Sequence, residues 1–160
     1  MERIFAPWRM SYVQNAGQEP GCVLCSALAG AGSEGSLVVH AGPLAFVVMN
    51  LFPYSSGHLM VALRRHVASL GEATAEELAE VMALSQRLEQ VLGEVYRPDG
   101  INLGINLGRA AGAGVADHIH LHLVPRWAGD SNFMTVTAGT RVIPEDPAEA
   151  AARLRERFSR

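Results

Sequence analysis

Three of the six histidines occupy alternate positions in the stretch HIHLHLVPRW, residues 118 to 127. Successive side chains of a strand point to opposite faces, so His118, His120 and His122 are expected to line one face and the intervening aliphatics the other. At about 3.3 Å per residue, the outer two histidines stand roughly 13 Å apart, too far to chelate one metal ion together. Three imidazoles also argue against a plain solvated strand face, because each titrates near neutral pH. The spacing therefore predicts three histidines with separate tasks.

A glycine-rich loop, GRAAGAG, leads directly into this strand and contains Gly108, Gly112 and Gly114. Small residues let backbone N–H groups approach an anion, although the same glycines could simply form turns. The loop lacks the lysine and the following helix of a P-loop. A phosphate cradle beside an imidazole nucleophile would nevertheless suit phosphoryl or nucleotidyl transfer.

The only two cysteines, Cys22 and Cys25, form a Cys-X-X-Cys pair. Such a pair could be a redox dithiol, half of a zinc site, or two small residues buried in a helix. The strand-rich sequence after Gly35 does not supply the βαβ setting of a thioredoxin-like dithiol, which argues against the first of these.

The elements that must position these residues follow from local patterns. Alternating or β-branched runs predict strands over residues 37–42, 45–50, 58–63, 100–106 and 118–125. A capping box between Thr74 and Glu77 begins a long helix that reaches Tyr96, with an apolar stripe made of Leu78, Val81, Met82, Leu88, Val91, Leu92 and Val95.

Two further helices complete the prediction, a short one that carries the cysteines and ends at Gly30, and a C-terminal one that begins at Pro147 behind Asp146. Together these elements predict an α+β fold with a mainly antiparallel sheet of about five strands. We expect a single domain over residues 1–160, with an irregular N-terminal arm.

Composition narrows the function classes. The chain has 160 residues, a formal net charge of -3 and no overall basic surface, so no nucleic-acid partner is expected. All 13 basic residues are arginines, which removes Schiff-base chemistry and the P-loop lysine. No segment approaches the roughly 20 apolar residues of a membrane span, so we expect no membrane association and a cytoplasmic location.

The stretch HIHLHLV resembles the motif of the histidine-triad family, and SSGHLMVAL resembles that family's upstream strand. The segments APWRMSYVQNA, CVLC, the glycine loop and VPRWAGDSNFM are similar to the bacterial branch that contains diadenosine tetraphosphate phosphorylases. The resemblance implies a HIT-like fold and nucleotidyl transfer through an adenylyl-histidine intermediate, with diadenosine tetraphosphate and inorganic phosphate yielding ADP and ATP.

Two alternatives stay open at this point. In the first, water resolves the same intermediate, and the protein is a hydrolase of dinucleoside polyphosphates or nucleoside phosphoramidates. In the second, the triad belongs to a purine-nucleotide-binding regulatory protein with little turnover. The histidine motif that would form the intermediate does not show whether phosphate or water then accepts the adenylyl group.

The resemblance also implies a role for each matching residue. His120 would be the nucleophile, His122 a partner of phosphate oxygens or the leaving group, and His58 an orienting histidine. Nucleotide-binding positions would be Asn50 at the ribose, Val48 and Leu51 near adenine, and Asn106, Ala113 and Gly114 at the phosphates. From the residues alone, Asn50 could merely end a strand, and His58 could be a turn histidine.

Zinc-containing members of the wider family imply a structural Cys₂His₂ site, here Cys22, Cys25, His66 and His118, and no organic cofactor. A homodimer is the usual assembly that the resemblance implies; the long helix could serve it or could pack on the sheet. The chain departs from many relatives at Gly114 and Val115, where a polar side chain is common, which puts the rate or the preferred phosphate length in doubt.

Overall fold

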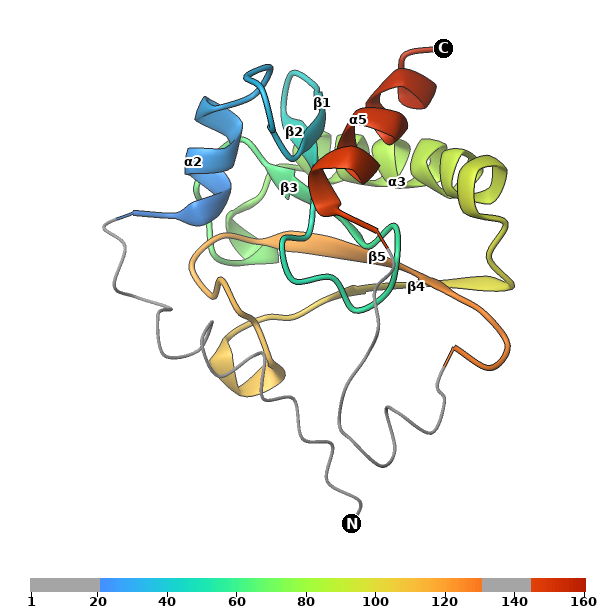
Figure 1. Ribbon diagram of the computed structural model, residues 1–160. Helices are drawn as coiled ribbons and strands as arrows, with labels where there is room; N and C mark the ends of the chain where they lie inside the picture. The colour runs from blue at the N-terminus through green and yellow to red at the C-terminus, as the bar shows by residue number, and fades with distance from the viewer. Residues whose placement is uncertain (1–20, 131–144) are drawn as a thin grey trace.

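The computed structural model describes residues 21–130 and 145–160 (Figure 1). The predicted N-terminal arm, the segment APWRMSYVQNA and the end of VPRWAGDSNFM lie outside the described residues. Among the helices of the described ranges, none combines the length and apolar character needed to cross a bilayer.

The sheet has five strands in the order β1-β2-β3-β5-β4, and every neighbouring pair is antiparallel. The strands are β1 (Val38–Ala41), β2 (Ala45–Met49), β3 (Leu59–Leu63), β4 (Gly100–Ile105) and β5 (His120–Arg126). The predicted α+β class and sheet are confirmed. One boundary was wrong, because β5 begins at His120 and not at His118. His120 is the first residue of the segment that pairs with β3. The residue before it, Ile119, donates its N–H to Val67 O at 2.7 Å, in the loop that follows β3.

Three helices match the predicted ones: α2 (Val23–Ala29), α3 (Ala75–Tyr96) and α5 (Pro147–Phe158). Short 3₁₀ turns occur at η1 (Leu70–Glu72) and η2 (Arg109–Ala111). The capping box of α3 is present, since Thr74 Oγ1 accepts from the N–H of Glu77 at 3.2 Å and Glu77 Oε2 accepts from the N–H of Thr74 at 2.8 Å. Asp146 caps α5 as predicted, accepting from two backbone N–H groups.

One face of the sheet is covered by α3 and α5, which lie above β4 and β5 in Figure 1. The predicted helical stripe is largely buried there, but Met82 is 56% exposed, whereas Leu84 and Ser85 are buried. The buried face is thus rotated toward Leu84, since α3 packs on β2, β3 and β5 and also on α5. The aliphatics between the histidines, Ile119, Leu121 and Leu123, enter this same core.

The opposite face carries the histidines. Here Leu24 of α2 packs in a smaller cluster with Val38, Phe46, Val48 and Ala62. The residues next to these in each strand, such as Val39, Val47 and Val61, face the main core. Two helices cover one face of the sheet, and α2 covers only part of the other face. Because side chains alternate along a strand, the histidines lie on this less covered face.

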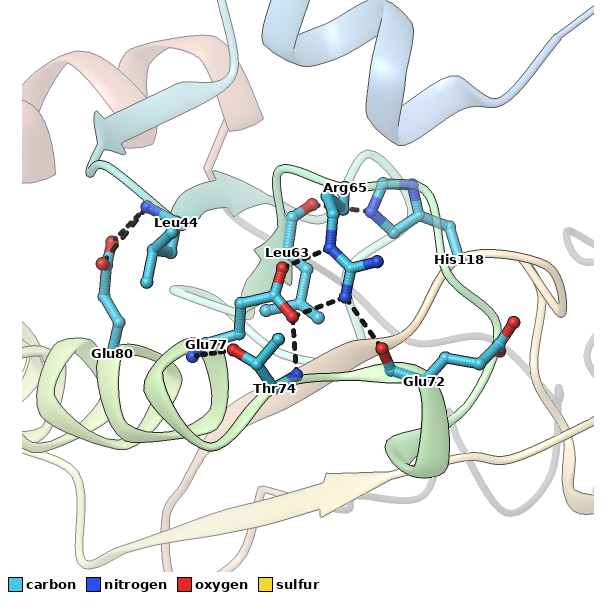
Figure 2. A network of polar contacts seen from close by, with 8 residues as sticks. All are labelled: Leu44, Leu63, Arg65, Glu72, Thr74, Glu77, Glu80 and His118. Carbon is cyan, nitrogen blue, oxygen red and sulfur yellow. Dashed lines mark hydrogen bonds and ion pairs between the residues drawn. The ribbon is translucent and has the colours of Figure 1, made fainter.

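The loop after β3 is tied to the start of α3 by an ion pair (Figure 2). The guanidinium of Arg65 donates to both carboxylate oxygens of Glu77, at 2.7 and 2.8 Å, and to Glu72 O at 2.8 Å. The hydrogen bond from Arg65, together with that from the N–H of Thr74, lowers the pKa of the Glu77 carboxyl to about 2. One carboxylate therefore caps α3 and holds the loop that contains His66.

Replacing Glu77 by glutamine should lower the urea midpoint of unfolding at neutral pH, whereas the neighbouring Glu76→Gln serves as the control in the same helical turn. A carboxyl with a depressed pKa stabilises the fold above its unfolded pKa, near 4.3, and loses that contribution as the pH falls toward 2. The gap between Glu77→Gln and wild type should therefore shrink steadily in acid. Equal midpoints for the two variants at neutral pH would contradict this prediction.

Candidate active site

His120 lies at the start of β5 with 5% of its surface exposed. Its Nδ1 is 2.8 Å from the carbonyl oxygen of His118, which can only accept, so Nδ1 carries the proton and donates. Burial lowers the pKa of His120, although the bond to His118 O acts in the opposite sense. His120 is therefore a neutral imidazole whose Nε2 holds an unshared electron pair, as a nucleophile requires.

His58 and His122 form a pair whose proton positions follow from one backbone group. The N–H of Tyr54 donates to Nδ1 of His58 at 3.0 Å, so the proton of a neutral His58 sits on Nε2. That nitrogen lies 2.9 Å from Nδ1 of His122, which must then accept, and the His122 proton is left on Nε2. Burial, and then the neighbouring His122 and His120, lower the pKa of His58 to about 3, which keeps it neutral.

The rings of His120 and His122 lie 4.8 Å apart, centre to centre, and meet nearly edge to face. One ring presents a free nitrogen and its neighbour an N–H on the same face of β5. This arrangement can attack an electrophilic centre and protonate the group that leaves it.

The depressed pKa of His58 has a consequence for stability. A histidine that stays neutral when folded but binds a proton when unfolded destabilises the fold as the pH drops below about 6.5. Between about pH 7 and pH 5 the wild type should lose about 2 kcal/mol more unfolding free energy than His58→Gln, which has no proton to gain. Urea denaturation at both pH values measures this; identical losses would contradict a buried neutral His58.

The predicted adenine and ribose positions have different settings. Val48 pairs with Met60, and Met60 pairs with His122. Val48 therefore lies on the same face of the sheet as His122, two strands away from it. Asn50 directly follows β2: its Oδ1 accepts from the N–H of Phe52 at 2.9 Å, and its Nδ2 lies 3.3 Å from Nδ1 of His58. Leu51 is 58% exposed at the turn that follows. These side chains border the turn that carries His58.

The predicted phosphate positions, Asn106, Ala113 and Gly114, lie in the segment between β4 and β5. Asn106 directly follows Ile105, which pairs with Leu121 beside His120. Gly104 pairs with His122, and a Cβ built on Gly104 would meet no atom of the described residues within 4 Å. In the glycine loop the N–H of Ala113 donates to Gly108 O at 3.3 Å, so this predicted anion donor has an internal partner, while Gly114 is exposed.

The second cluster brings together Cys22 and Cys25 from α2, His66 from the loop after β3, and His118. One ligand atom from each lies within 4.8 Å of every other, with Cys22 Sγ 3.3 Å from His118 Nδ1 and Cys25 Sγ 3.4 Å from His66 Nδ1. A tetrahedral zinc ion with usual bond lengths has S–N edges of about 3.5 Å, so the four residues fit that metal.

The protonation of the ligands agrees with this. The Nε2 of His118 donates to Leu63 O at 2.7 Å, as Figure 2 shows, which turns Nδ1 toward the thiols and supplies the outer bond typical of zinc-ligating histidines. Burial and the adjacent Cys22 raise the pKa of the Cys25 thiol, so a bound cation would have to lower this pKa to hold the thiolate. Zinc held here would cross-link α2 to the loop after β3 and to the histidine strand.

Several groups that complete these sites were missed from the sequence. The N–H of Tyr54 and the carbonyls of Leu63 and His118 are backbone groups, which carry no residue-type signal. Ser55 is buried and donates to Pro125 O at 2.7 Å, tying the His58 turn to β5. Arg65 precedes His66 in the chain, and no local sequence pattern predicts its ion pair with Glu77.

Comparison with known proteins adds an independent line of evidence. The family model described as the HIT domain matches residues 32–129, a span that includes both histidine clusters except for the cysteines. The chain belongs to the histidine-triad family. A HIT-family relative from Mycobacterium tuberculosis, named AP-4-A phosphorylase, is 41% identical over 152 residues, covering 91% of this chain and 78% of the relative.

Two further comparisons give a curated relative and a solved structure. An asymmetrical bis(5'-nucleosyl)-tetraphosphatase from Schizosaccharomyces pombe is 33% identical over 96 residues, covering 60% of this chain and 52% of that protein. The crystal structure of a Zn-bound histidine-triad protein from Mycobacterium smegmatis superposes with a TM-score of 0.69 at 28% identity, covering 87% of this chain and 94% of that one.

Proposed function

We propose that this HIT-family protein transfers the adenylyl group of diadenosine tetraphosphate to inorganic phosphate, yielding ADP and ATP. The observation that carries the chemistry is the pair of fixed tautomers, a free Nε2 on His120 beside an N–H on His122. The 41% identity to the M. tuberculosis AP-4-A phosphorylase supports the substrate and the acceptor.

In the first step, Nε2 of His120 attacks the α-phosphorus, and a P–N bond forms as the bond to the bridging oxygen breaks. The departing ATP takes the proton from Nε2 of His122, while the carbonyl of His118 holds the Nδ1–H of the developing imidazolium. In the second step, a phosphate oxygen attacks, the P–N bond breaks, ADP leaves, and the phosphate proton returns to His122. His58, neutral and donating to His122, keeps that ring in the required tautomer.

The nucleotide would lie along the histidine face, with adenine near Val48 and Leu51 and the ribose at Asn50. The α-phosphate would meet Asn106 and the backbone of Gly114, and Ala113 would join once its bond to Gly108 O opens. Because Gly114 and Val115 carry no polar side chain, backbone donors would have to hold the phosphates. Slower turnover than in relatives with a hydroxyl there is the expected cost.

Zinc, held by Cys22, Cys25, His66 and His118, would serve a structural role and supply no step of the reaction. The closed set of four protein ligands supports this, since a catalytic zinc keeps one position open. Both cysteines are free thiols, which suits a reducing compartment such as the cytoplasm.

A homodimer is the proposed assembly. Strand β4 is an edge of the sheet, and Leu103 on it and Leu107 beyond it are 48% and 45% exposed, a surface that a second copy could cover. Light scattering at micromolar concentration should give twice the 17.1 kDa chain mass, and Leu103→Arg should shift the particles toward monomer. Particles of only 17.1 kDa in the wild type would contradict the dimer.

Product analysis tests the proposed reaction. Pure protein and His120→Ala are incubated with diadenosine tetraphosphate, with and without phosphate, and the nucleotides are separated. ADP plus ATP formed only with phosphate is the expected result. AMP plus ATP formed without phosphate would identify a hydrolase, and nucleotide binding without turnover would identify a binding protein.

A further inference from the structure

One aromatic side chain holds the turn that carries His58 against the long helix. Gly57, which precedes His58, has a φ of +74°, and a Cβ built on it would lie 2.8 Å from Cε2 and 3.0 Å from Cδ2 of Tyr96. The bare glycine backbone is therefore packed directly against the tyrosine ring. Both the positive φ and this contact require glycine at the position.

Tyr96 also contacts Glu145 and Arg153, near and within α5. Tyr96 is the last residue of α3, its hydroxyl donates to Glu145 Oε2 at 2.6 Å, and the Arg153 guanidinium carbon lies 5.0 Å from the ring centre. Burial and the adjacent carboxylate raise the pKa of Tyr96 well above its usual value, so the hydroxyl keeps its proton and donates. The ring thus contacts both Arg153 of α5 and Gly57 of the His58 turn.

Within the described residues, the His58 turn is also held by hydrogen bonds of its own and by a bond from Ser55 to β5. It is closed internally by the bonds from Asn50 N to His58 O, at 3.0 Å, and from His58 N to Ser55 O, at 3.2 Å. Ser55 ties it to β5 through Pro125 O, at 2.7 Å. From α3, Tyr96 supplies the contact with Gly57.

We propose that Tyr96 is a positioning residue for the histidine pair: its ring holds Gly57 so that His58 stays at hydrogen-bond distance from His122. The inference rests on the proposed function, because it affects turnover only if His122 donates the leaving-group proton. The ring of Tyr96, and not its hydroxyl, positions the turn, because the ring atoms make the contact with Gly57.

The proposal predicts a change in the acid behaviour of His58. Within the described residues, the titratable groups that face His58 are His122 and His120 from β5 and Tyr54 from its own turn, with Tyr96 of α3 behind Gly57. Removing the ring opens space for water beside Gly57 and weakens the burial that keeps His58 neutral. Its pKa should then rise from about 3 toward its ordinary value.

The experiment compares Tyr96→Leu and Tyr96→Met, which remove the ring, with Tyr96→Phe, which keeps it. Leu84→Ala is the control, because it truncates a buried core residue of the same helix about 18 Å from Tyr96 along the axis. Phosphorolysis of diadenosine tetraphosphate is measured across acid pH, and the His58 ring is titrated by NMR in each protein.

Loss of the ring should lower kcat about tenfold to a hundredfold, with KM changed less than about threefold. The acid limb of the pH profile of kcat should move to higher pH by about one unit or more. Tyr96→Phe should stay within about twofold of wild type, and Leu84→Ala should keep the wild-type acid limb. An unchanged acid limb in the ring-deleted variants, or a Tyr96→Phe loss as large as theirs, would overturn the proposal.

A wild type without turnover would refute the proposed function, while the NMR titration of His58 would still test the positioning. If both ring-deleted variants fail to fold, the kinetics of Tyr96→Phe decide, because the hydroxyl alone is predicted to be dispensable.

Discussion

Replacing His120 by alanine is expected to lower kcat for adenylyl transfer by about 10⁴-fold or more, because the variant has no nitrogen to form the covalent bond to phosphorus. Binding of the dinucleotide should change much less, since the remaining contacts with adenine, ribose and phosphates do not involve the His120 ring. Stopped assays of nucleotide products, with equilibrium binding measured separately, test both parts.

The control for this variant is His40→Gln. His40 lies on β1 with its ring 4.7 Å from that of Phe158, on the side of α5, and belongs to neither histidine cluster. It should keep wild-type turnover. If His120→Ala retained more than about a hundredth of the wild-type kcat, attack by His120 could not be the main route.

Replacing Cys25 by serine should remove the metal and much of the stability it confers. Zinc content is expected to fall from about one equivalent to less than about a tenth, because serine is a poor ligand for zinc and three ligands remain. Loss of the cross-link between α2 and the histidine strand should lower the thermal midpoint by about 5–15 °C, which corresponds to a few kcal/mol for a domain of this size.

Ser26→Ala is the matched control for this prediction, since Ser26 is the exposed neighbour in the same helix and offers no ligand. It should keep both zinc and the wild-type midpoint. Protein purified without added metal that holds less than about a tenth of an equivalent would refute a tight zinc site, as would equal midpoints for Cys25→Ser and Ser26→Ala.

The parts that could be predicted from the sequence depend on local rules. Alternation placed the aliphatics of HIHLHLV in the main core and the histidines on the other face, and the capping pair of Thr74 and Glu77 marked the start of α3. Such patterns report on neighbours within a few residues. For the same reason they misplaced Met82, whose exposure depends on which strands the helix crosses.

The proton positions in the candidate site could not be predicted in this way. The bond between His58 and His122 joins residues 64 positions apart, and it forms only because β3 and β5 are neighbours in the sheet. The tautomers depend on backbone groups of Tyr54 and His118, which every residue possesses. The candidate metal cluster, by contrast, was predicted through family resemblance, and the structure places its four residues together.

The most direct test of the central claim is to trap the intermediate on His120. The protein is incubated with diadenosine tetraphosphate in phosphate-free buffer, quenched, digested with trypsin, and analysed by mass spectrometry for the peptide bounded by Arg109 and Arg126. We predict that this peptide gains the mass of one adenylyl group, localised to His120, and loses it when phosphate is added before quenching. Turnover of the substrate without any adenylylated His120 under these conditions would contradict the mechanism.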